Sequence, residues 1–137
     1  MTIIESEKVQ IAKPLAEVFA FLGNANNHEK LMPESIYNWS STEDECKFTI
    51  QNMAKLELKI SERDPAGKIV IIPSVKAPFD IQIEWILTEQ ANGCTAQMNI
   101  HADLNPFIKM MAVGPLTKLV NHQVQALLAS NSLATKN

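Results

Sequence analysis

The chain has 137 residues, which is within the usual range for one domain and allows one hydrophobic core but not two. Its formal net charge of -3 leaves no basic surplus to neutralise phosphates, so nucleic acids and anionic membranes are disfavoured as partners. No apolar stretch approaches the ~20 residues of a membrane span, and the first residues lack the pattern of a signal peptide. We therefore expect a cytoplasmic protein without integral membrane association.

The chain contains no internal repeat, low-complexity tract or linker-like segment, which predicts a single domain over residues 1–137. Its two cysteines, Cys46 and Cys94, are not part of a CxxC or Cys/His pattern. We expect both thiols to be reduced and buried, rather than joined in a disulfide or bound to zinc.

The N-terminal part predicts a strand followed by two short helices. Residues 3–11 end in an alternation of apolar and polar side chains that is typical of a half-buried strand. Pro14 ends this strand and suits the first turn of a helix, and apolar residues then recur at helical spacing up to Gly23. Asn26 and Asn27 can cap a second short helical turn over residues 28–32, which Pro33 closes.

The middle of the chain has the period of two that is typical of β-strands. Apolar and polar residues alternate over residues 47–51 and 56–61. The turn signal Asp-Pro-Ala-Gly at residues 64–67 leads into an apolar run at 69–72. This pattern predicts two strands and a hairpin to a third.

The strongest alternation occurs in residues 79–87 and 94–104. In the first segment the odd positions are apolar and only Ile86 breaks the pattern, whereas the second segment has no exception. The turn at residues 90–93 joins the two segments as a hairpin. One face of the predicted sheet is therefore apolar and the other is polar.

The apolar residues return to a helical period after residue 105, which predicts a helix over residues 106–130. At 1.5 Å per residue this helix would be roughly 37 Å long, enough to cross a small sheet.

The order of these elements resembles the SRPBCC or START-like superfamily, also called Bet v 1-like or helix-grip. The resemblance is carried by the opening VQIAKPLAEVFAFLGNANNHEKLMPE, the strand AQMNIHADLNP and the terminal helix. The opening is similar to the polyketide cyclase/dehydrase and lipid transport branch. The resemblance implies an α+β fold in which a curved antiparallel sheet of about seven strands wraps around the long C-terminal helix. It also implies an apolar cavity between the two that holds a hydrophobic small molecule.

The sequence gives no support for catalysis or metal binding. His28, His101 and His122 are scattered, and we expect them to be solvated side chains, because zinc needs three or four convergent ligands. The acidic residues between positions 29 and 45 are expected to form a solvated surface rather than an acid/base pair. No nucleophile elbow, phosphate loop or catalytic Cys/His signature occurs, so no catalytic residue, metal or cofactor is predicted.

We therefore predict a noncatalytic carrier or sensor of a hydrophobic small molecule that is lipid-, polyketide- or isoprenoid-like, in a monomer or weak homodimer. Methionines suit such a pocket because the thioether side chain is flexible. The residues expected to line the cavity are Ile50, Leu58, Ile71, Ile83, Trp85, Met98, Ile100, Phe107, Met110 and Met111.

Two other functions stay open. An enzyme of the cyclase or aromatase type would use the same cavity and would need an inward polar residue, for which Asn52, Ser74 and Tyr37 are weak candidates. A protein-interaction module resembling the Hsp90 activators would instead use the outer face of the sheet.

Overall fold

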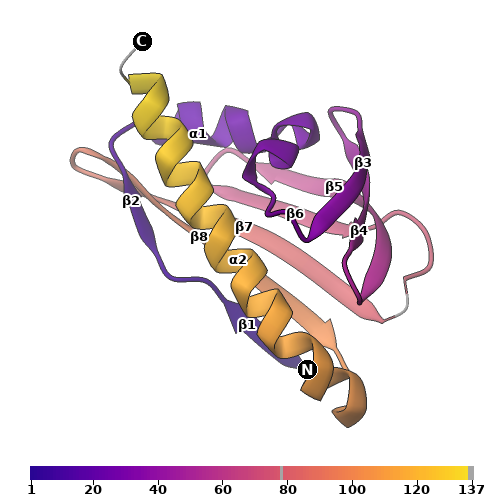
Figure 1. Ribbon diagram of the computed structural model, residues 1–137. Helices are drawn as coiled ribbons and strands as arrows, with labels where there is room; N and C mark the ends of the chain where they lie inside the picture. Colours follow the sequence, from indigo (N-terminus) through magenta and orange to yellow (C-terminus); the bar gives the residue numbers. More distant parts are fainter. Residues whose placement is uncertain (78, 136–137) are drawn as a thin grey trace.

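Strands form the largest share of the regular structure in the described chain, and a single long helix follows them (Figure 1). The computed structural model describes residues 1–77 and 79–135. The elements follow in the order β1 (Thr2–Glu5), β2 (Val9–Ile11), α1 (Leu15–Leu22), η1 (Ala25–Leu31), β3 (Ile36–Ser41), β4 (Glu45–Ile50), β5 (Ala54–Asp64), β6 (Lys68–Pro73), β7 (Asp80–Gln90), β8 (Gly93–Asp103) and α2 (Pro106–Thr135).

The strands form one curved, unclosed antiparallel sheet. Its order is β1-β8-β7-β6-β5-β4-β3, and β2 also pairs with β8. Figure 1 shows α2 crossing the sheet and the two short helices, α1 and the 3-10 helix η1, gathered at one end. This arrangement confirms the expected α+β helix-grip fold, with eight strands instead of about seven.

The additional strand arises because the N-terminal strand is interrupted. Glu5 pairs with Asn99 and Val9 pairs with Ala96, so three residues of the N-terminal segment face two residues of β8. Such an extra residue is a β-bulge, which bends a strand and redirects its backbone groups. Ser6 stays in place because its hydroxyl accepts a hydrogen bond from the backbone N–H of Met98, at 2.9 Å.

The bulge connects the N-terminal segment to α2. The backbone N–H of Glu7 points away from β8 and donates to Oδ1 of Asn121, at 2.8 Å. The side chain of Gln125 donates a second hydrogen bond to the Glu7 carboxylate. The edge of the sheet is thereby hydrogen-bonded to the helix that covers its inner face.

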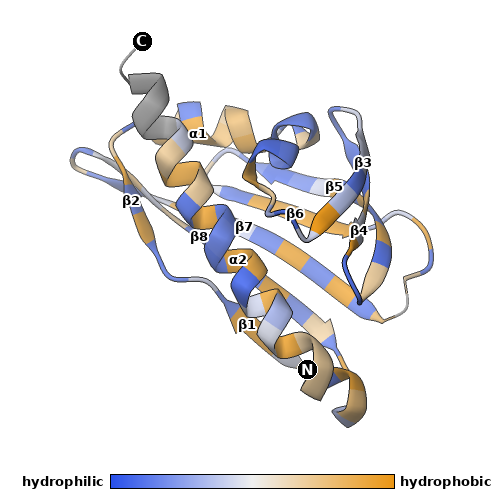
Figure 2. Cartoon of the chain, in the orientation of Figure 1, coloured by the Kyte–Doolittle hydropathy of each residue, from blue (hydrophilic) through white to orange (hydrophobic). Residues whose placement is uncertain are grey.

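Alternation along the strands places the core between the sheet and α2. Figure 2 shows hydrophobic and hydrophilic residues alternating along β7 and β8. Met98 and Ile100 are buried, as their inward parity predicts. The helix contributes a buried stripe to the same core, formed by Ala112, Leu116, Leu119, Val120, Val124 and Leu127.

Neither α1 nor α2, nor any other helix in residues 1–77 and 79–135, is long and apolar enough to cross a lipid bilayer.

Candidate ligand-binding site

A small internal cavity lies between the inner face of the sheet and α2. Its walls are side chains from β4 to β8, from η1 and from α2. The volume is about 20 Å³, which is room for one water molecule. Side chains therefore fill almost all of the space that the resemblance assigned to a ligand.

The structure brings six of the ten predicted lining residues to this cavity. They are Ile50, Leu58, Ile71, Ile83, Met98 and Ile100. All six are inward-facing residues of strands, so the period of two was sufficient to place them. Their role in binding a ligand stays a prediction. Trp85 is fully buried in the same core but does not line the cavity.

Phe107, Met110 and Met111 are not where we expected them. Their exposed fractions are 71%, 84% and 58%, and none of them lines the cavity. At roughly 100° per residue these three side chains lie on one side of α2, and the buried Leu116 is about 180° around the helix from Phe107. The expectation grouped two opposite sides of one helix into a single stripe and was wrong for these residues.

Two polar side chains that the prediction did not include line the cavity, and His28 is the first. It is 3% exposed, which corrects the expectation of a solvated side chain. The reason is the 3-10 geometry of η1, in which every third residue shares a face, so that His28 is buried with Ala25 and Leu31. A period of three in the sequence was the signal for this face.

The imidazole of His28 is neutral. Its Nε2 lies 2.7 Å from the backbone oxygen of Leu22, and because a carbonyl only accepts, Nε2 carries the proton. Burial is the main cause that lowers the pKa of His28. The hydrogen bond to Leu22 acts in the opposite direction and raises the pKa, whereas the positive charge of Arg63 lowers it further. The remaining ring nitrogen, Nδ1, is therefore a hydrogen-bond acceptor.

We expect this buried histidine to make the stability of the protein fall in mild acid. The folded-state pKa of His28 lies below the usual 6.5, so the unfolded chain binds a proton more readily than the folded one. The stability that the neutral histidine provides is therefore full above pH 6.5 and is lost as the pH falls from 6.5 toward the folded-state pKa. The free energy of unfolding should drop by up to about 1.4 kcal/mol per pH unit below 6.5. Urea unfolding between pH 7.5 and 5 should show this slope in the wild type and not in His28→Gln. Parallel curves for the two proteins would contradict it.

The second polar residue is Gln123 of α2, which is 1% exposed. Its Oε1 is buried and has no hydrogen-bond partner. The sequence already indicated this residue, because a glutamine falls within the buried stripe of the terminal helix, but the prediction did not include it.

Cys46 also lines the cavity. Burial raises the pKa of its thiol to about 12, so the thiol stays protonated and is a poor nucleophile.

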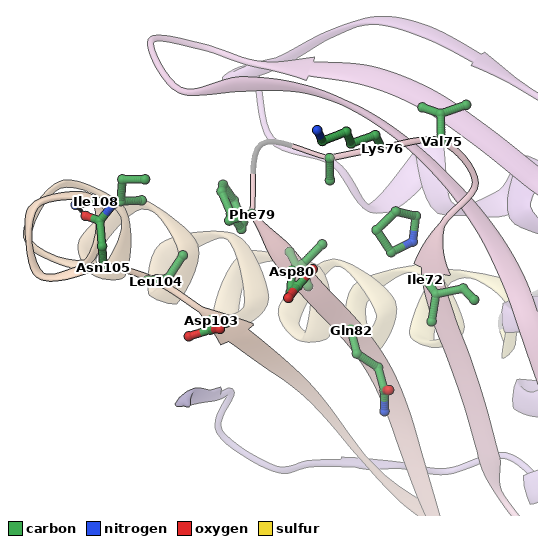
Figure 3. A pocket seen from close by; sticks show the side chains of 13 residues that line it. Ile72, Val75, Lys76, Phe79, Asp80, Gln82, Asp103, Leu104, Asn105 and Ile108 are labelled. Atoms are coloured by element: carbon green, nitrogen blue, oxygen red, sulfur yellow. Dashed lines mark hydrogen bonds between the residues drawn. The ribbon is translucent and has the colours of Figure 1, made fainter.

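A larger, open groove adjoins this cavity (Figure 3). It has a volume of about 770 Å³ and lies between the β6–β7 connection, the end of β8 and the first turn of α2. Its wall is mixed: the apolar residues are Ile72, Pro73, Val75, Ala77, Phe79, Ile81, Leu104 and Ile108, and the polar ones are Lys76, Asp80, Gln82, Asp103 and Asn105. Ile81 lines both the groove and the internal cavity, so the two spaces meet at this residue.

A second groove, of about 470 Å³, lies between the η1–β3 connection and α2. It shares Ile50 and Leu119 with the internal cavity. Its mouth also includes Lys118 and His122, and His122 is exposed, as expected.

Charged side chains form a cluster on the outer face of the sheet. Oε1 of Glu84 lies 3.0 Å from Nε2 of His101, and its Oε2 lies 3.7 Å from Nζ of Lys68. Burial alone would raise the pKa of Glu84, but hydrogen bonds from His101 and Asn99 and the nearby positive charges outweigh it and lower the pKa. His101 is thus a partly buried hydrogen-bond partner of Glu84 rather than a freely solvated side chain.

The arrangement provides few groups for catalysis. Asn52 and Tyr37 are exposed and Ser74 is half-buried, and none of the three lines the internal cavity. Within residues 1–77 and 79–135, no three His, Cys, Asp or Glu side chains are close enough together to hold a metal ion.

Comparisons with known proteins identify the fold. No protein-family model matches the sequence, and no curated protein matches it. XoxI from Bacillus cereus has a TM-score of 0.75 at 12% identity, over 100% of this chain and 99% of that one. KanY has a TM-score of 0.77 at 10% identity, over 96% and 99% of the two chains. TTHA0849 from Thermus thermophilus has a TM-score of 0.74 at 10% identity, over 99% and 100%. The chain therefore shares its antiparallel sheet and C-terminal helix with these small proteins.

Proposed function

We propose that the protein binds a hydrophobic small molecule, lipid-, polyketide- or isoprenoid-like, and acts as a noncatalytic carrier or sensor. The observation that carries this proposal is that Ile81 lines both the open groove and the internal cavity. The groove volume of about 770 Å³ lies in the range of ~300–1,000 Å³ that is usual for small-molecule sites. The adjoining cavity extends this space into an apolar interior.

The ligand lies in the groove and reaches the cavity by displacing side chains. A cavity of about 20 Å³ is too small for a ligand, so its walls must move apart on binding. Met98 lines the cavity, and its unbranched thioether side chain adapts its shape more readily than a branched residue. Each CH₂ group that the ligand buries contributes about 0.8 kcal/mol, so longer apolar ligands bind more tightly.

Membership of the SRPBCC or START-like superfamily, in its polyketide cyclase/dehydrase and lipid transport branch, is part of the same proposal. It is supported by the arrangement of the sheet around α2 and by the opening sequence. A cytoplasmic location and a monomer or weak homodimer complete it. For the cyclase or aromatase alternative, Asn52, Ser74 and Tyr37 do not line the cavity, and its inward polar residues are instead His28 and Gln123.

Ile108→Glu tests the groove. Ile108 is a half-buried wall residue, and a carboxylate there would have to lose its hydration against an apolar ligand. We expect the affinity for the neutral fluorescent probe N-phenyl-1-naphthylamine to fall at least ~10-fold, which is about 1.4 kcal/mol. Titration of the probe into both proteins measures the change, and thermal unfolding confirms that the variant is folded.

Met110→Glu is the matched control. Met110 lies on the same part of α2 but is exposed and outside the groove wall, so this variant should bind like the wild type. A folded Ile108→Glu variant with unchanged affinity would show that the groove is not used. Absence of probe binding by the wild type, together with no copurified ligand in native mass spectrometry of protein from its own host, would remove the proposal.

A further inference from the structure

The described residues do not explain why the polar side chain of Gln123 is buried in the core. Its Oε1 is buried without a hydrogen-bond partner, in a cavity whose other walls are largely apolar. An unsatisfied buried polar atom costs about 1–3 kcal/mol, and such atoms are uncommon in native proteins. Leucine would fill a similar volume without this cost, so the glutamine indicates a partner that arrives from outside the chain.

His28 belongs to the same cavity wall as Gln123. Its Nε2 hydrogen atom is used by the backbone oxygen of Leu22, which leaves Nδ1 with a lone pair. Oε1 of Gln123 is also an acceptor. The polar groups of the cavity are therefore complementary to a donor, and an O–H group is the smallest donor that an apolar molecule can carry.

The same wall disfavours a negatively charged ligand. No lysine or arginine is among the described residues that line the cavity. The Arg63 guanidinium, whose charge acts on His28, donates instead to the backbone oxygens of Gly23 and Glu43 and to Asp44. A carboxylate at this position would face two acceptors without a compensating cation, which makes its burial costly.

We infer that Gln123 and His28 select a neutral apolar ligand that carries a hydroxyl group at its inner end, an alcohol or phenol rather than a fatty-acid anion. This inference rests on the proposed function, because it presupposes that a ligand reaches the cavity. The hydroxyl donates to Oε1 of Gln123.

Three ligands of matched shape test the selectivity: 2-naphthol, naphthalene and 2-naphthoate. The wild type should bind 2-naphthol about 10-fold more tightly than naphthalene, as one buried hydrogen bond provides, and should bind 2-naphthoate most weakly. In Gln123→Leu the preference for the hydroxyl should fall to about 3-fold or less. Displacement of N-phenyl-1-naphthylamine at pH 7.5 measures all three affinities.

The ligand-free variant gives an independent readout. Because Gln123→Leu removes an unsatisfied buried polar atom, its melting temperature should rise by about 2–6 °C. Gln125→Leu, on an exposed position of the same helix, is the control and should retain the wild-type preference for 2-naphthol.

The possible outcomes separate this inference from the proposed function. Equal binding of naphthalene and 2-naphthol by the wild type, or a full preference for 2-naphthol in Gln123→Leu, would overturn the inference and leave a hydrophobic binding site in place. Failure of every apolar probe to bind would instead overturn the proposed function. Tight binding of 2-naphthoate would contradict the charge argument directly.

Discussion

Gly93→Ala should destabilise the protein by at least about 3 kcal/mol. Gly93 is the first residue of β8, and its φ of +148° is a conformation that residues with a Cβ rarely adopt. A Cβ atom built there would lie 2.0 Å from the backbone oxygen of Ile11 and 3.0 Å from the backbone nitrogen of Lys13. These neighbours are backbone atoms, so the clash could be relieved only by separating β2 from the β7–β8 hairpin. Urea unfolding followed by circular dichroism measures the loss.

Gly114→Ala is the control for this substitution. Gly114 is an exposed residue inside α2, and a Cβ atom there would meet nothing within 4 Å beyond its own helix backbone and its two chain neighbours. Alanine loses less backbone entropy than glycine when a helix forms, but the ring of Pro115 crowds a Cβ on the preceding helical residue. The two effects oppose each other, so this variant should stay within about 1 kcal/mol of the wild type. A Gly93→Ala variant with wild-type stability would show that the β7–β8 turn does not have the described geometry.

Val124→Asp should abolish the docking of α2. Val124 is fully buried in the stripe that packs on the sheet, and a carboxylate at this position has no described cation to pair with in the apolar core. Burial of an unpaired charge costs several kcal/mol, which is comparable with a typical total stability of about 5–15 kcal/mol. We expect the variant to lose its near-ultraviolet circular dichroism and its cooperative unfolding transition.

His122→Asp provides the comparison for Val124→Asp. His122 is exposed two positions earlier on the same helix, so a carboxylate there stays hydrated, and the change should cost less than about 1 kcal/mol. A native-like Val124→Asp variant would mean that α2 does not cover the sheet through this stripe.

The sheet and the covering helix could be predicted from the sequence because each follows from a local period. The alternation in β7 and β8 identified their inward residues, and the turn signal before Gly93 predicted the hairpin between them. The interruption between β1 and β2 could not be predicted in this way. It depends on the hydrogen bonds of Ser6 with Met98 and of Glu7 with Asn121, which join residues distant in sequence, and a local pattern does not contain such contacts.

The candidate site was predictable only where it is made of strands. Inward parity placed Met98 and Ile100 at the cavity, whereas Met110 and Met111 were misplaced because hydrophobicity was given more weight than their angular position on the helix. His28 was missed for a different reason. Polar residue types are usually exposed, and only the three-residue period of η1 indicated that this one faces the core.

The hydrogen bond between Glu7 and Asn121 has a consequence for the order in which the molecule assembles. It joins residues 114 positions apart, so it can form only after nearly the whole described chain has been synthesised. Strands β3 to β8 pair mainly with neighbours in sequence and have no such constraint. During synthesis the apolar face of the sheet therefore stays exposed until α2 has been made. In this interval the nascent chain is most prone to aggregation and to binding by chaperones.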